Sequence, residues 1–124
     1  MSGLILVLAG CTAPNAEKVS ADEVKAYADA VVDKMLAGIN EKDYAKFSGD
    51  FDQQMKDAVT EAKFGEIYNQ LGECESKGII SADKYQGYTR AYYKGKSSGM
   101  SRDVTFTIVF SASGDKKVSG FFYK

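Results

Sequence analysis

The chain has 124 residues, the usual size of a single domain, and its 44% hydrophobic and 27% charged residues are ordinary for a folded protein. Its net charge of −1 does not indicate nucleic acid or another polyanion as a partner. Because the sequence contains no histidine, the commonest general base and metal ligand is excluded.

An apolar run at residues 4–8 is followed by Ala9, Gly10 and Cys11. The run is too short for a transmembrane helix, which needs about 20 apolar residues. Small residues directly before a cysteine resemble the lipobox of bacterial lipoproteins, in which the thiol receives a diacylglyceryl group and cleavage leaves the cysteine first. We therefore interpret residues 1–11 as the end of a signal peptide and predict that lipid on Cys11 anchors the protein to the extracytoplasmic face of a membrane. The alternative is a buried strand that ends at a structural cysteine.

Residues 12–19 form a polar segment that contains the only proline and shows no pattern of a regular element. We predict a tether, which at full extension would reach about 25–30 Å and keep the domain close to the membrane. Lipidation of Cys11 would leave Cys74 alone, whereas an exported protein without it could form a Cys11–Cys74 disulfide. Glu73 and Glu75 would raise the thiol pKa, so we expect Cys74 to be a half-buried strand residue.

A long helix is predicted to begin after Ser20. Ser20 and Glu23 form a capping box, and Val19 and Val24 form a hydrophobic staple. A stripe at helical spacing then gives about 19 residues one buried face; it comprises Val24, Ala28, Val31, Val32, Met35, Leu36 and Ile39. Three shorter helices are expected at residues 44–47, at residues 51–59, and after Thr60 up to Leu71, with Gly72 in the C′ position.

From Glu73 onward the period of apolar residues changes to two, which predicts strands at residues 73–83, 86–96, 102–113 and 116–124. A tight turn at residues 113–115 joins the last two. Helices followed by a meander predict an α+β domain over residues 20–124, in which N-terminal helices pack on one face of a curved four-stranded antiparallel sheet.

This order of elements resembles the nuclear-transport-factor-2-like, or cystatin-like, cone fold. The resemblance is carried by the pattern Asn-x-x-Asp-Tyr-x-x-Phe at residues 40–47, by Asp50-Phe51 and by Leu71-Gly72. Within that fold, residues 20–124 are similar to an uncharacterised domain family found in prokaryotic lipoproteins and ahead of some α/β-hydrolase domains. The resemblance implies a cone whose mouth can hold a small ligand.

Enzymes of this fold use an Asp/His or Tyr/Asp pair inside the cone, and no histidine can be carried over to this chain. The sequence also contains no Gly-x-Ser-x-Gly elbow, so the hydrolase activity of fused relatives does not transfer. We therefore assign no catalytic residue.

A possible ligand or partner surface is predicted on the second strand. Alternation places Tyr88, Arg90, Tyr92 and Lys94 on one strand face, with Arg102 nearby. Because a dry core would leave both cations unpaired, we expect this face on the concave side or at the rim of the cone. The alternative is core packing and cross-strand pairing of the aromatic residues.

The charges are unevenly distributed, since residues 1–83 contain 8 basic and 15 acidic side chains and residues 84–124 contain 8 basic and 2 acidic ones. This indicates either an acidic layer packed on a basic one or a basic surface for an acidic ligand or anionic lipid. No metal site is predicted, because Asp29 and Asp33 lack a third ligand and the aspartates at residues 50–57 do not have the EF-hand spacing.

Together these patterns predict a membrane-anchored extracytoplasmic lipoprotein whose single domain binds a small ligand or an envelope protein, without a cofactor and without nucleic acid. Two alternatives remain. One is an enzyme of the same fold that uses a tyrosine and a carboxylate in the cone, and the other is a structural envelope protein that docks through the basic sheet.

Overall fold

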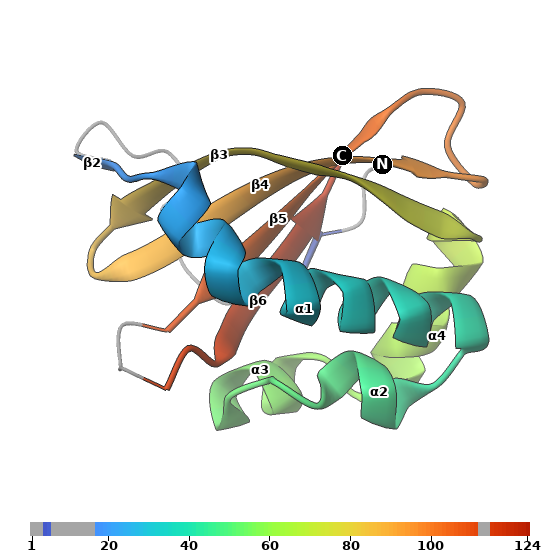
Figure 1. Ribbon diagram of the computed structural model, residues 1–124. Helices are drawn as coiled ribbons and strands as arrows, with labels where there is room; N and C mark the ends of the chain where they lie inside the picture. Colours follow the sequence, from blue (N-terminus) through green and yellow to red (C-terminus); the bar gives the residue numbers. More distant parts are fainter. Residues whose placement is uncertain (1–3, 6–16, 112–114) are drawn as a thin grey trace.

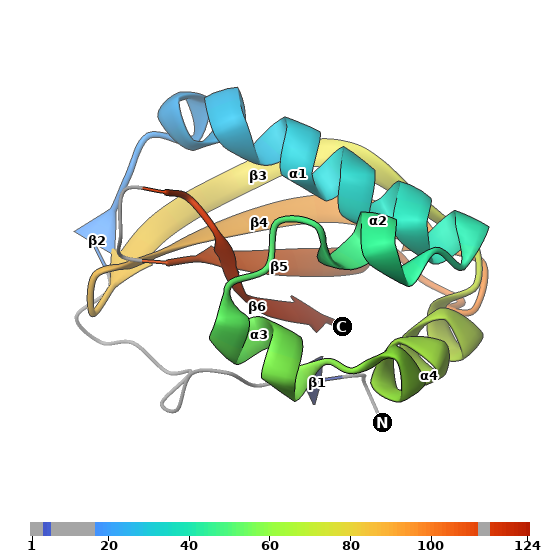
Figure 2. The ribbon, with the colours of Figure 1, turned by 90° about the horizontal axis from the view of Figure 1, so that it is seen from below.

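The computed structural model describes residues 4–5, 17–111 and 115–124. Four helices precede the long strands: α1 (Ala21–Glu41), α2 (Tyr44–Ser48), α3 (Gln53–Ala58) and α4 (Glu61–Leu71). Figures 1 and 2 show all four on the same side of the sheet, with α1 running along it. None of these helices is both long enough and apolar enough to cross a membrane.

Each helix begins at a side chain that accepts a hydrogen bond from the backbone three residues ahead. Ser20 accepts from Glu23, Asp43 from Lys46, Asp52 from Met55 and Thr60 from Lys63. The predicted starts after Ser20 and Thr60 are therefore confirmed, because an N-cap oxygen satisfies a backbone N–H that the first turn leaves without a partner. The predicted buried stripe of α1 is also confirmed, except that Val31 lies half-buried at its edge.

The sheet has the strand order β1-β6-β5-β4-β3-β2, and all of its pairs are antiparallel. The predicted four-stranded meander corresponds to β3 (Cys74–Tyr85), β4 (Tyr88–Ser97), β5 (Val104–Phe110) and β6 (Val118–Tyr123). The described residues add two short edge strands, β1 (Leu4–Ile5) and β2 (Glu17–Lys18), so the count of four strands is too low.

The two short strands bear on the predictions for the N-terminal segment. β1 belongs to the predicted signal segment and pairs with Phe121 and Phe122 of β6. β2 pairs with β3, so the prediction of a tether without a regular element is wrong at Glu17–Lys18. The reason is that the Val19 N–H donates to the Ala82 carbonyl at 3.3 Å, which leads the chain along the edge of β3 into α1. Cys11 and the rest of residues 6–16 lie outside the described residues.

The β3–β4 hairpin turns two residues later than the predicted break at residues 84–85. Tyr85 pairs with Tyr88, and Gln86 and Gly87 form the turn with φ values of 52° and 85°. Two positive φ values in a two-residue loop indicate a type I′ turn, whose usual signal is Asn-Gly or Asp-Gly. The sequence has glutamine in place of that first residue, so its turn signal is weak.

A cluster of aromatic side chains lies at the centre of the interior between the helices and the sheet. Phe47 is fully buried, and its ring centroid lies 5.2 Å from that of Phe51, 4.8 Å from Phe64 and 5.8 Å from Phe121. Phe106 stacks on Phe121 from the neighbouring strand, with the centroids 6.2 Å apart. The centre of the cone is therefore a packed core.

Candidate functional site

The predicted surface of Tyr88, Arg90, Tyr92 and Lys94 lies on the outer face of the sheet. Of the two positions expected for it, the concave side and the rim, the concave side is therefore wrong. The neighbouring residues Ala91 and Tyr93 are the ones buried against the helices. Because side chains alternate along a strand, the even-numbered residues must point away from them.

The physical reason for this placement is a partner on the outer face. Asp83 lies opposite Arg90 in the β3–β4 register. The Arg90 guanidinium donates to both Asp83 carboxylate oxygens, from Nε at 2.6 Å and from its second nitrogen at 2.9 Å. The Tyr92 hydroxyl donates to the same carboxylate at 3.1 Å. An arginine whose guanidinium is paired with a carboxylate in this way does not need water inside the cone to hydrate it.

This outer cluster also stacks, since the Arg90 guanidinium lies 5.2 Å from the Tyr85 ring centroid and 5.9 Å from that of Tyr92. Burial raises the pKa of the Tyr92 hydroxyl to about 12, so it remains a hydrogen-bond donor at neutral pH. The Asp83 hydrogen bond raises the pKa of Arg90. Arg90 and Tyr92 are thus brought together, but they are engaged in internal contacts.

The other predicted residues do not join this cluster. Lys94 pairs with Asp103, with 3.4 Å between its Nζ and a carboxylate oxygen. Arg102 lines a separate small pocket of about 130 Å³ that also contains Lys96 and Met100. Tyr88 is half-buried at the start of β4. Four of the five predicted residues therefore share the outer face of β4, but only Arg90 and Tyr92 contact the same carboxylate, and Arg102 lies apart from them.

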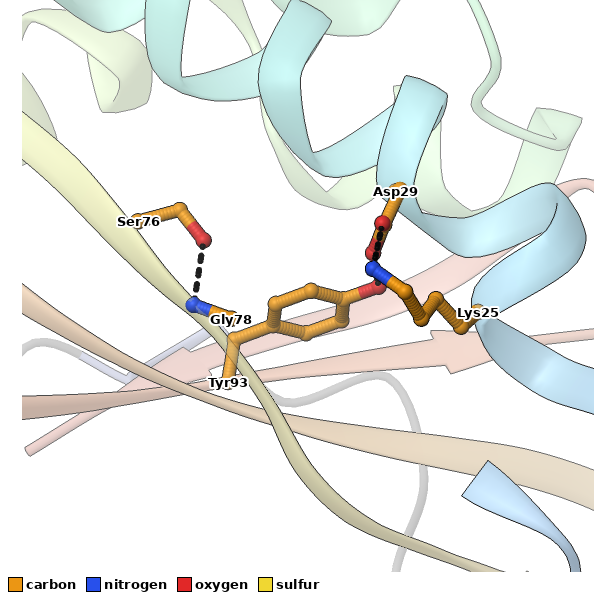
Figure 3. Close-up of polar contacts among 5 residues, drawn as sticks. All are labelled: Lys25, Asp29, Ser76, Gly78 and Tyr93. Atoms are coloured by element: carbon orange, nitrogen blue, oxygen red, sulfur yellow. Dashed lines mark hydrogen bonds and ion pairs between the residues drawn. The ribbon is translucent and has the colours of Figure 1, made fainter. Parts of the chain in front are cut away.

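A tyrosine–carboxylate pair does occur between helix and sheet (Figure 3). The Tyr93 hydroxyl donates to Asp29 of α1 at 2.6 Å, and Lys25 donates to the other carboxylate oxygen at 2.5 Å. Figure 3 shows the Tyr93 side chain pointing from β4 past Gly78 of β3 toward α1; at Gly78 the backbone N–H donates to the Ser76 hydroxyl at 3.2 Å.

The pKa shifts of Asp29 and Tyr93 are those of a structural hydrogen bond between helix and sheet. Hydrogen bonds from Lys25 and then from Tyr93 lower the pKa of Asp29. Burial and the Asp29 contact raise the pKa of Tyr93 far above the usual range. The phenol therefore keeps its proton, and the carboxylate is ionised with both oxygens engaged.

An open cavity of about 460 Å³ lies between the start of α1 and the ends of β3, β4 and β5. Its lining residues come from positions 19 to 116 of the chain and combine apolar, hydroxyl and charged groups: Val19, Glu23, Val24, Tyr27, Lys84, Gly87, Thr89, Phe110, Ser111 and Lys116. Among these described lining residues, none belongs to the predicted surface.

The apolar part of the cavity is built by the helix and by β5. Val24 and Phe110 are buried, and the half-buried Tyr27 ring packs edge-on against Phe110 with centroids 5.1 Å apart. Burial raises the pKa of the Tyr27 phenol, and a hydrogen bond with Thr89 offsets part of that rise. Tyr27 is therefore a neutral group in this wall at physiological pH.

The charged part of the cavity is its rim. Glu23, Lys84 and Lys116 are exposed there. The Lys116 ammonium lies 5.1 Å from the centroid of the Tyr27 ring, a cation–π arrangement. Two lysines and one glutamate carry the charge among the described lining residues, and the Asp115 carboxylate lies beside the rim, because it accepts from the hydroxyl of the lining residue Ser111 at 3.1 Å.

Sequence reasoning missed this cavity although a signal for it existed. Alternation along β4 puts Arg90 on one face and Thr89 on the other. If the face with Arg90 had been predicted to point outward, Thr89 would have been predicted to point toward the helices. Tyr27 lies three residues after Val24, at the edge of the apolar stripe of α1. Within the described part of the chain, no group of three histidine, cysteine or acidic residues is arranged to hold a metal ion.

Comparison with known proteins supports the fold. No protein-family model matches the sequence, and no curated protein matches it. A solved structure that is similar is a designed nuclear-transport-factor-2-like protein, Rd1NTF2_05 with five substitutions, at a TM-score of 0.56 and 16% sequence identity. The match covers 83% of this chain and 100% of that chain. The predicted nuclear-transport-factor-2-like cone fold is thereby confirmed, and at this identity the comparison shows the fold alone.

Proposed function

We propose that this nuclear-transport-factor-2-like domain binds a small organic ligand in the cavity beside the start of α1. The observation that carries the proposal is the cavity itself, whose volume of about 460 Å³ lies in the range of about 300–1,000 Å³ usual for ligand pockets. Val24, Tyr27 and Phe110 give the cavity an apolar wall for a ligand to pack on, and the polar and charged side chains around that wall can orient the ligand.

Binding is proposed in preference to catalysis because of how the candidate acid–base groups are used. A general base needs an accessible oxygen within reach of a substrate. Asp29 already accepts from Tyr93 and Lys25, and the aromatic core fills the centre of the cone.

A dye experiment tests the binding proposal. N-phenyl-naphthylamine is neutral and fluoresces strongly when it leaves water, so the wild-type protein should enhance its emission. Thr89→Trp should abolish the enhancement by filling the cavity, whereas Thr107→Trp, at a half-buried position of β5 outside the cavity, should retain it. A wild-type protein that does not enhance the dye, or a Thr89→Trp variant that enhances it equally, would overturn the proposal.

We further propose that the protein is a lipoprotein anchored by Cys11 on the extracytoplasmic face of a membrane. The support is the sequence alone, in which Ala9 and Gly10 precede the cysteine. Mass spectrometry of membrane-expressed protein should find diacylglycerol on Cys11 and residues 1–10 removed. Unmodified Cys11 with those residues still attached would overturn this proposal. In that case β1 would remain in the protein as an edge strand on β6.

A further inference from the structure

We infer that the ligand of the cavity beside α1 is an aromatic anion, with its ring against Tyr27 and its acidic group between Lys84 and Lys116. This inference rests on the proposed function, since it names the ligand class of the same cavity. It is carried by the charges of the rim, by the backbone at Lys116 and by the aromatic wall.

The rim charges favour an anion. Of the lining residues that the structure describes, Glu23, Lys84 and Lys116 are charged. Within residues 17–111 and 115–124, neither lysine forms an ion pair, although Glu17 lies opposite Lys84 in the strand register. Both ammonium groups are therefore available to a carboxylate, sulfonate or phosphate.

Lys116 is held at the cavity by an uncommon backbone conformation. Its φ of 56° lies in the left-handed region, which a residue with a side chain seldom adopts. Both neighbours are bonded to Ser111, whose N–H donates to the Lys117 carbonyl at 2.8 Å and whose hydroxyl donates to the Asp115 carboxylate at 3.1 Å. Such strain persists where neighbouring contacts impose it, and it concentrates at functional sites.

The contact between Lys116 and Tyr27 defines where a ligand fits. The ammonium lies 5.1 Å from the ring centroid, so a cation already occupies that aromatic wall. An aromatic anion can use both groups at once, by packing its ring on Tyr27 and pairing its acidic group with the displaced ammonium. An aromatic cation would instead be repelled by two lysines.

Three probes with one ring and different charges test the inference by isothermal titration calorimetry: naphthoate, naphthalenemethanol and naphthylmethylammonium. We expect naphthoate to bind about tenfold more tightly than the neutral alcohol and the cation to bind most weakly, the size expected of two ion pairs at an exposed rim. Binding of the alcohol or the cation as tight as that of naphthoate would overturn the inference and leave the proposed function standing. No binding of any probe would overturn both.

Variants of the rim give effects of opposite sign. Lys84→Gln and Lys116→Gln should each weaken naphthoate binding about threefold to fivefold and leave binding of the alcohol unchanged. Glu23→Gln, which keeps the backbone N–H that Ser20 accepts from, should tighten naphthoate binding about twofold to threefold. Lys117→Gln removes the same charge one residue away from Lys116 and outside the cavity, and should have no effect.

These variants also separate a local site from a general effect of charge. Equal weakening by Lys117→Gln and Lys116→Gln would overturn the inference, because only the net charge of the protein would then matter. Tighter binding of naphthoate by Lys116→Gln would overturn it as well. Raising the salt concentration should weaken naphthoate binding and leave binding of the alcohol unchanged, because exposed ion pairs are screened.

Discussion

Two glycines in helix interiors make opposite predictions for the same substitution. Replacing a glycine by alanine inside a helix normally stabilises a protein by about 1 kcal/mol. A Cβ on Gly38 of α1 would lie 2.6 Å from the Phe47 backbone nitrogen and 2.8 Å from its Cα. A Cβ on Gly65 of α4 would meet nothing nearer than the Tyr68 hydroxyl at 3.9 Å, an ordinary contact.

The backbone of α2 cannot move away from Gly38 easily. Phe47 is fully buried among other rings, and the Asp43 N–H donates to the Gly38 carbonyl at 2.8 Å. Overpacking of this kind costs about 1–3 kcal/mol. Since the contacts here involve backbone atoms, we take the upper part of that range and subtract the helical gain, which makes Gly38→Ala less stable by about 2 kcal/mol.

Urea unfolding followed by circular dichroism measures both variants. Gly65→Ala should be more stable than wild type by about 0.5–1 kcal/mol, which separates the two variants by about 3 kcal/mol, or roughly 12 °C in melting temperature. A Gly38→Ala protein as stable as wild type would refute the close approach of α1 and α2. Equal destabilisation by both substitutions would show that the close approach of α1 and α2 is not the cause of the lower stability of Gly38→Ala.

Three further predictions concern two contacts between helix and sheet and one buried thiol. The Asn40 side chain bonds both the N–H and the carbonyl of Cys74, at 2.7 and 2.9 Å. Asn40→Leu should therefore lower the free energy of unfolding by about 2–4 kcal/mol. The control Asn69→Leu, at an exposed position of α4, should change it by less than about 0.5 kcal/mol. Tyr93→Phe should cost about 1 kcal/mol and raise the pKa of Asp29, which NMR titration of the carboxyl group would detect; an unchanged Asp29 pKa would contradict the contact in Figure 3. Burial raises the pKa of the Cys74 thiol from 9.0 to about 12, so the unfolded chain releases this proton at lower pH than the fold does. The stabilising contribution of the thiol is thus complete below pH 9 and is lost as the pH rises toward 12. Under reducing conditions, the difference in unfolding free energy between wild type and Cys74→Ala should therefore shrink from pH 8 to pH 10. Parallel pH profiles of the two proteins would contradict this prediction.

The faces of β4 show where prediction from sequence stops. Alternation assigns Tyr88, Arg90 and Tyr92 to one face, but it does not say which face meets the helices. The expectation of a concave position assumed that Arg90 lacks a partner, and the structure supplies one in Asp83. That pairing depends on the hairpin register, which is set by a turn at Gln86–Gly87 that the sequence signals only weakly.

The sequence by itself determined the starts of α1, α2 and α4, the apolar stripe of α1, the change to strand periodicity and the order of elements that indicates the cone fold. These features depend on groups three or four residues apart, as in the Ser20 cap, or on strict alternation along one strand. It also carries the lipobox-like end at Cys11, which is a prediction from the residues alone.

Only the tertiary structure decided which side chains meet. Tyr93 bonds Asp29 across 64 residues of chain, and the cavity wall combines Tyr27 of α1 with Lys116 of the β5–β6 connection. Such contacts depend on the register, twist and packing of whole elements, and no local spacing encodes them. For this protein, local patterns therefore predict where the helices and strands lie along the chain. The location of the candidate ligand site depends on how α1 packs against the sheet, which no local pattern predicts.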